Sequence, residues 1–152
     1  IKLYLAVIYP PPLKKEQYIT SNIEKSSFSK VRKMTTSDVK GKFAKTYMKT
    51  LVKNSKYALV LLYPITGRTH QLRVHMNYIG CSIIGDKKYK LNENFRDNEN
   101  FLKLHSYVIK FPNQDFIKAP LPEHFINFMK ENKLDINLEK IEKNFEKEFK
   151  HE

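Results

Sequence analysis

The chain has 152 residues, enough for one domain with a sizeable hydrophobic core. Its 28 Lys and Arg against 16 Asp and Glu give a formal charge of +12, which favours polyanionic partners. One cysteine excludes an internal disulfide framework, and without a membrane-spanning apolar run or a secretory signal we expect a cytoplasmic protein with no membrane contact.

The first part of the chain is expected to be rich in strands. Residues 3–9 form an apolar run with Tyr and Val, and three prolines stop it. The polar segment that follows predicts only a short edge strand around residues 18–23. Residues 29–36 alternate basic and apolar side chains and predict a strand with one basic face. Residues 37–42, with Asp38 and Gly41, are typical of a turn.

A hairpin and a short helix are expected next. Residues 43–52 and 57–63 read as two strands joined by a tight turn. Pro64 and Gly67 end the second strand, Thr69 can cap a helix, and Gly80 can end it in a left-handed conformation.

The faces of this helix separate by spacing. Leu72, Met76 and Ile79 should face the core. Arg73 shares another face with His70 and lies near Arg68, beside a helix N-terminus that favours anions. A phosphate or carboxylate would fit there, whereas the simpler interpretation is that Arg73 pairs with a structural acid.

The last part of the chain contains strands and most of the helices. Residues 81–84 read as a short buried stretch with a buried thiol, and residues 87–100 as a polar loop. Two strands are expected at residues 103–111 and 116–118, and Pro122 suits the start of a helix that ends near residue 132. Residues 135–150 predict a second helix with an apolar stripe, supported by the pairs Glu139–Lys143 and Glu146–Lys150. The pattern predicts an α+β fold, with residues 1–132 forming the main unit and residues 133–152 a helix that docks on it.

One stretch carries a recognisable motif. Residues 67–75 read GRTHQLRVH and are followed by Ile79-Gly80 and by Ile84-Gly85-Asp86. The order and spacing closely resemble the signature of RluA-type pseudouridine synthases. Three further segments are similar to that family: Lys2 to Val7, Leu104-His105-Ser106 and Pro120-Leu121-Pro122.

The resemblance, over about residues 2–128, implies a large mixed, mainly antiparallel sheet flanked by helices around an RNA cleft. The family's His-Arg-Leu-Asp motif with its nucleophilic aspartate does not occur in the chain. We therefore expect a partial catalytic domain, the C-terminal portion of a longer one, that is inactive by itself.

The resemblance also implies site residues. Arg73 is the expected partner of the missing aspartate, Tyr4 the ring that stacks on uracil, and Leu104 a wall of the pocket. Arg68 and His70 are expected to contact RNA, as are Lys87 and Lys88, which fit a solvated basic rim nearly as well. Without the resemblance, Tyr4 in an apolar strand reads as a core residue.

No metal or cofactor is expected. His70 and His75 are five residues apart and point to different helix faces, which does not fit a zinc pair. The reaction implied by the resemblance needs neither a metal nor a redox cofactor. Asp86 reads as a structural acid of a turn rather than a nucleophile.

The expected function is therefore isomerisation of specific uridines to pseudouridine in structured RNA by a monomer, with ribosomal RNA preferred over transfer RNA. The alternative is a non-catalytic basic RNA-binding module on a synthase-like scaffold. A third, weaker hypothesis is a protein-interaction domain whose charge only reflects composition.

Overall fold

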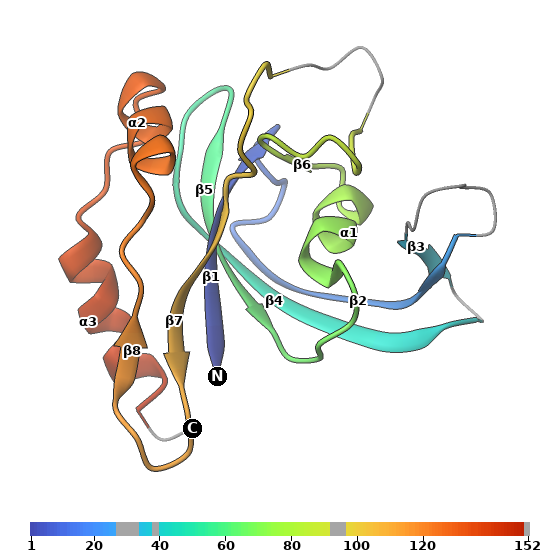
Figure 1. The fold of residues 1–152 in the computed structure, drawn as a ribbon, viewed down its shortest axis with the longest axis horizontal. Helices are drawn as coiled ribbons and strands as arrows, with labels where there is room; N and C mark the ends of the chain where they lie inside the picture. Colours follow the sequence, from blue (N-terminus) through green and yellow to red (C-terminus); the bar gives the residue numbers. More distant parts are fainter. Residues whose placement is uncertain (27–33, 38–39, 92–96, 151–152) are drawn as a thin grey trace.

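The computed structural model describes residues 1–26, 34–37, 40–91 and 97–150, and it contains one sheet and three helices (Figure 1). This architecture confirms the α+β class. Most of the predicted basic strand at residues 29–36, the predicted turn residue Asp38 and the middle of the polar loop lie outside the described residues. The described parts of that loop contain no helix.

The sheet contains eight strands in the order β3-β2-β4-β5-β1-β7-β8, with β6 paired to β1. Every pairing between described strands is antiparallel. The bounds are β1 Lys2–Tyr9, β2 Glu16–Lys25, β3 Met34–Ser37, β4 Lys42–Lys53, β5 Ala58–Pro64, β6 Ser82–Ile83, β7 Leu104–Lys110 and β8 Phe116–Lys118. The predicted hairpin is confirmed as β4 and β5, in which Met48 pairs with Leu62.

β1 lies inside the sheet and contributes buried side chains to both of its faces. Successive side chains of a strand point to opposite faces. Leu3 and Leu5 belong to one buried apolar cluster, while Ala6 and Ile8 belong to another, against which Tyr4 packs. The position of Tyr4 is therefore set by the period of the strand and by its pairing with Leu62 and Ser106.

The helices α2 (Glu123–Glu131) and α3 (Leu138–Glu148) lie at one side of the sheet, and α1 (Gln71–Tyr78) lies at the other (Figure 1). Phe125 of α2 and Phe145 of α3 are buried in the same cluster as Leu3 and Leu5. The predicted apolar stripe of α3 is confirmed, because Ile141 and Phe145 are buried. The side chain of Asn137 caps the helix. The division of the chain at residue 132 stays a prediction.

The predicted ion pairs along α3 are wrong. Neither Glu139–Lys143 nor Glu146–Lys150 is an ion pair between the described residues. Instead, Lys118 of β8 lies 3.0 Å from Glu142 and 3.6 Å from Glu146. Glu146 therefore lies near a lysine of β8 instead of pairing with Lys150.

β2 also differs from the prediction. It is ten residues long and lies between β3 and β4, rather than being a short edge strand. Ile19 and Ile23 are buried on one face, whereas Tyr18 on the other face is exposed. The exposed face explains the polar composition that hid the strand.

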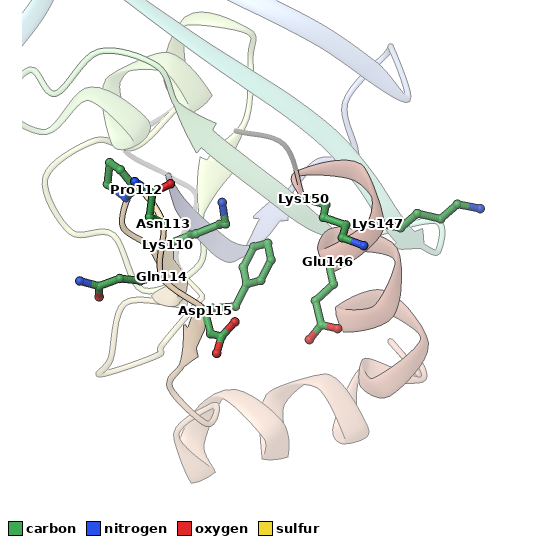
Figure 2. Close-up of a pocket in the computed structure, with 9 residues that line it drawn as sticks. Lys110, Pro112, Asn113, Gln114, Asp115, Glu146, Lys147 and Lys150 are labelled. Carbon is green, nitrogen blue, oxygen red and sulfur yellow. The ribbon is translucent and has the colours of Figure 1, made fainter.

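An open cleft of about 870 Å³ lies between the β7–β8 turn and α3 (Figure 2). Lys110 and Phe116 line it from the strands, Lys147 from α3 and Lys150 from the turn after that helix. Phe116 also packs on the cluster under α2 and α3, so the cleft belongs to that side of the sheet.

A smaller expectation from the sequence is also met. Cys81 is a buried free thiol, and its burial raises its pKa to about 11. Within the described part of the chain, no helix has both the length and the apolar character needed to cross a membrane.

Candidate functional site

The motif of residues 67–86 folds into a turn, the helix α1, the strand β6 and a second turn. Leu72 and Met76 are buried as predicted, and Gly80 follows the helix with a φ of 85°. The prediction that Thr69 caps the helix is wrong. The N-cap is His70, which has left-handed backbone angles and no side-chain cap hydrogen bond.

Gln71, rather than Thr69, makes the side-chain hydrogen bonds that close the turn before α1. Its Oε1 accepts hydrogen bonds from the hydroxyl of Thr66, at 2.6 Å, and the backbone N–H of Arg68, at 3.0 Å. Its Nε2 donates to the carbonyl oxygen of Lys45, at 2.9 Å, and to the hydroxyl oxygen of Thr46, at 2.9 Å. One buried side chain thus joins the turn and α1 to β4.

His75 fixes the other side of the same helix. Its Nδ1 lies 2.7 Å from the hydroxyl oxygen of Thr46, and its Nε2 lies 2.9 Å from that of Ser21. Burial lowers the pKa of His75 to about 4, so the ring is neutral at pH 7. α1 therefore has fixed contacts with both β2 and β4.

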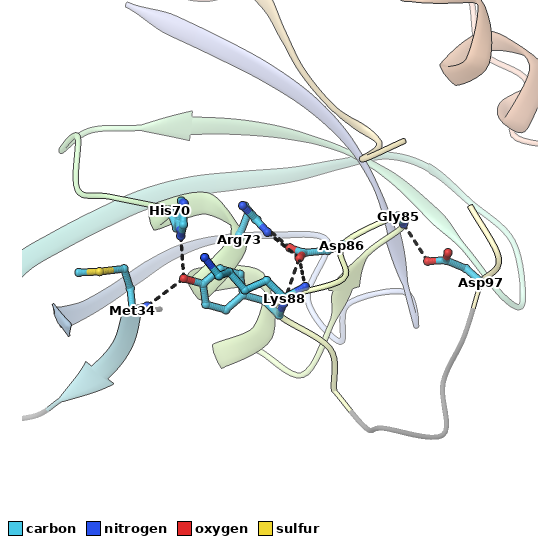
Figure 3. Close-up of polar contacts among 8 residues, drawn as sticks. Met34, His70, Arg73, Gly85, Asp86, Lys88 and Asp97 are labelled. Atoms are coloured by element: carbon cyan, nitrogen blue, oxygen red, sulfur yellow. Dashed lines mark hydrogen bonds and ion pairs between the residues drawn. The ribbon is translucent and has the colours of Figure 1, made fainter. Parts of the chain in front are cut away.

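Arg73 leaves this helix and pairs with Asp86 (Figure 3). Its Nε donates to Oδ2 at 2.9 Å, and its Nη2 donates to Oδ1 at 2.8 Å. These hydrogen bonds raise the pKa of Arg73. The simpler interpretation of the sequence, in which Arg73 pairs with a structural acid, describes this contact.

Asp86 is the acid of a tight turn, as predicted. Its Oδ1 also accepts the backbone N–H groups of Lys88 and Tyr89, each at 3.0 Å. Its side chain is 1% exposed, against 21% for that of Arg73. Four N–H donors therefore satisfy a carboxylate that solvent barely reaches.

Tyr89 lies against the face of the same guanidinium. The Cζ of Arg73 is 4.9 Å from the centre of its ring, a cation–π arrangement. The Tyr89 hydroxyl lies 2.8 Å from Nδ1 of His70 and accepts the backbone N–H of Met34 at 2.9 Å. Arg73 is thus held by groups from outside its own helix.

An open cavity of about 560 Å³ lies beside Arg73. Five predicted site residues line it: Tyr4, Arg68, His70, Arg73 and Leu104. The remaining described residues in its lining include no aspartate or glutamate. The chain brings together a tyrosine ring, an apolar wall and basic groups there, and the described lining adds no acid.

The other two predicted RNA-binding residues lie elsewhere. Lys87 lines a separate cavity of about 320 Å³ together with Asp97. Lys88 contributes its backbone N–H to the turn at Asp86. These lysines do not line the cavity beside Arg73.

A second groove continues from this cavity. It has a volume of about 330 Å³, shares Gly67 and Arg68 with the first cavity, and is also lined by Lys25 and Lys42. The Nε of Arg68 donates to the carbonyl oxygen of Phe43 at 2.8 Å, which fixes this side chain at the junction. Arg68, Lys25 and Lys42 therefore line adjoining hollows, together with the acid Glu24 in the second groove.

The sequence reasoning missed Gln71, His75 and Tyr89 as parts of the site. All three lie in or near the motif. Gln71 and His75 could have been found as polar residues of a helix that was expected to pack against the sheet. Nothing local marks Tyr89, because its partners come from β3 and α1.

Comparisons with known proteins agree on one family. Residues 1–78 match the family model described as RNA pseudouridylate synthase. The chain is 38% identical over 130 residues to "Ribosomal large subunit pseudouridine synthase C" of Rickettsia bellii, covering 82% of this chain and 43% of that protein. It is 36% identical over 141 residues to the protein of the same name from Buchnera aphidicola, covering 84% and 44%.

Solved structures give the same result. The human RNA pseudouridylate synthase domain-containing protein 1 aligns with a TM-score of 0.68 and 26% identity, covering 80% of this chain and 54% of that one. The human domain-containing protein 4 aligns with a TM-score of 0.67 and 25% identity, covering 85% and 60%. The chain spans less than half the length of the Rickettsia and Buchnera proteins it matches.

Proposed function

Because the chain belongs to the RNA pseudouridylate synthase family, we propose that the protein containing it converts uridine to pseudouridine in structured RNA. The observation that carries the proposal is the cavity that Tyr4, Arg73 and Leu104 line together. In this reaction the bond between ribose C1′ and base N1 breaks, and a bond between C1′ and C5 forms. N1 gains a proton and C5 loses one, so no oxidant or reductant is needed.

Each cavity residue has a role in the proposal. Tyr4 stacks on the uracil while the base is detached, and Leu104 forms the apolar wall beside it. Stacking of a base on an aromatic ring is worth about 1–3 kcal/mol. Arg73 pairs with the nucleophilic carboxylate, lowers its pKa and fixes its rotamer.

The nucleophilic acid comes from another segment of the protein in this proposal. The described lining of the cavity contains no carboxylate, and Asp86 is sealed by its four donors. We therefore expect residues 1–152 alone to be inactive. Arg68 and His70 contact phosphates beside the cavity, and Lys87 and Lys88 contact phosphates outside it.

The RNA substrate in the proposal is ribosomal. The Rickettsia and Buchnera relatives carry names that refer to the large ribosomal subunit, and this supports ribosomal over transfer RNA. The second candidate function is a non-catalytic RNA-binding module. It is favoured by one observation, namely that Asp86 already pairs with Arg73.

Turnover by the full-length protein tests the proposal. We expect it to form pseudouridine in large-subunit ribosomal RNA, measured by mass spectrometry of nucleosides, and residues 1–152 to form none. Arg73→Ala should lower turnover about 100-fold or more while the Kd for RNA changes less than about threefold. Wild-type binding without turnover would instead support the binding module, and full activity of Arg73→Ala would refute the role of Arg73.

A further inference from the structure

We propose that Asp86 and Tyr89 are positioning residues that hold the Arg73 guanidinium by one edge and one face, so that its end is presented to a carboxylate. This inference rests on the proposed function, in which Arg73 pairs with the nucleophilic acid. It assigns a role to two side chains that are not themselves expected to touch the RNA.

The first argument is the number of N–H donors. A guanidinium has five, arranged in a rigid fork. Asp86 takes the Nε donor and one Nη2 donor, which lie along one edge. Among the described residues, no other acceptor bonds to Arg73. One donor on Nη2 and both on Nη1 remain, and two of these point the same way from the end of the group, which suits a second carboxylate.

The second argument is burial. The Asp86 side is closed to solvent, whereas Arg73 is partly exposed and lines the cavity. Because Asp86 occupies one edge of the guanidinium and does not line this cavity, we infer that the opposite end of the guanidinium faces the cavity. All the hydrogen bonds of the Asp86 carboxylate are made within the protein, whereas Arg73 pairs with Asp86 and also lines the cavity.

The third argument is the fixed orientation of Tyr89. Its ring covers one face of the guanidinium, and its hydroxyl is tied to His70 at the start of α1 and to Met34 of β3. A flexible arginine would have to be ordered when the nucleophile arrives, and a long basic side chain carries about 2 kcal/mol of rotamer entropy. Asp86 and Tyr89 remove this cost before the RNA binds.

Asp86→Asn isolates the positioning role from the turn. The amide oxygen can still accept the backbone N–H groups of Lys88 and Tyr89, but the amide nitrogen meets the Nε donor of Arg73. Asp97→Asn is the matched control, because Asp97 also accepts backbone N–H groups, from Gly85 and Glu99, and does not contact Arg73 (Figure 3).

In the full-length protein, we expect Asp86→Asn to lower kcat about 100-fold, the scale of a displacement near 1 Å, and to change KM less than about threefold. Asp97→Asn should leave both constants within about twofold of the wild type. An unchanged kcat for Asp86→Asn in an active protein would overturn the inference. So would an equal loss in the two variants, because it would indicate a general effect on the turn.

The NMR signal of Arg73 provides a test without turnover. In the full-length protein with ¹⁵N-labelled arginine, the signal is assigned by its loss in Arg73→Lys. We expect a shifted Nε–H resonance in the wild type that moves towards free arginine in Asp86→Asn but not in Asp97→Asn. Tyr89→Leu should move the resonance, whereas Tyr89→Phe keeps the aromatic face and should retain it.

The two measurements separate the inference from the proposed function. Absence of turnover by the wild type would refute the function, while the resonance would still decide whether Asp86 and Tyr89 hold Arg73. A wild-type resonance at the position of free arginine, or one that Asp86→Asn leaves in place, would overturn the inference even in an active enzyme.

Discussion

The Nδ1 of His75 lies 2.7 Å from the hydroxyl oxygen of Thr46, inside the interface between α1 and β4. Both side chains are buried, and Ser21 bonds the other nitrogen of the ring. The hydroxyl groups of Thr46 and Ser21 carry no charge, so these two partners do not stabilise an imidazolium as a carboxylate would. The contact is therefore suited to a neutral histidine.

This environment predicts a loss of stability in acid. Burial lowers the pKa of His75 from 6.5 to about 4, so between these values the unfolded chain binds a proton that the folded chain excludes. The unfolding free energy should fall as the pH drops from 7. At pH 5 the loss due to His75 is about 2 kcal/mol. Urea unfolding at several pH values measures it.

The control for this prediction is another histidine. His75→Gln should flatten the dependence on pH, whereas His105→Gln, on β7 at the far side of β1, should keep the wild-type slope. Equal slopes for the wild type and His75→Gln would show that His75 does not titrate in this range.

Tyr4 should act through its ring. In the full-length protein, Tyr4→Ala should lower kcat/KM about 5- to 150-fold, because the loss of one stacked base costs about 1–3 kcal/mol. Tyr4→Phe keeps the ring and should stay within about threefold of the wild type. If the two variants are equally impaired, the hydroxyl rather than the ring matters and stacking is the wrong role.

Arg68 should contribute to RNA affinity through charge. Arg68→Gln should weaken binding to all RNA sequences alike and lower the slope of log K against log salt by about 1. Lys140→Gln, on the exposed face of α3, removes the same charge from another side of the protein and should leave the slope unchanged. A slope that Arg68→Gln does not alter would contradict a phosphate contact.

Gly85 and Gly80 provide a matched pair for the turn beside Asp86. Both have positive φ, 83° and 85°, so alanine at either position costs about 1–2 kcal/mol. At Gly85 an added Cβ would also lie 2.2 Å from the carbonyl oxygen of Phe101, whereas at Gly80 nothing lies within 4 Å. We expect Gly85→Ala to lower the unfolding free energy by about 2–5 kcal/mol in total. Equal losses for the two variants would rule out this close approach.

Patterns within one segment predicted the fold well. The alternation in β4 and the apolar run of β5 gave the hairpin, and helical spacing gave the buried face of α1. These features depend on neighbouring residues, whose preferences agree with the final structure. The full length of the polar strand β2 was not predicted in this way, because its place between β3 and β4 is decided by pairing with other strands.

Contacts across long distances were not predictable. Gln71 closes the turn before α1, and its Nε2 is held by the carbonyl oxygen of Lys45. The position of Lys45 depends on how β4 pairs in the sheet and cannot be read from the motif. Lys103 is a second case. Its side chain is 1% exposed and donates to the carbonyl oxygen of Phe101, and burial lowers its pKa. In so basic a chain, nothing in the sequence distinguishes this buried lysine from lysines exposed to solvent.

The alternation along β1 restricts how this strand can change in length. Its odd-numbered leucines pack under α2 and α3, and Tyr4 faces the cavity on the opposite side. Deleting Leu5 would move Leu3 and Tyr4 to opposite faces relative to the rest of the strand, which would turn the tyrosine away from the cavity. Deleting two consecutive residues of β1 would preserve the faces of the residues that remain. Insertions and deletions tolerated in this strand should therefore come in even numbers.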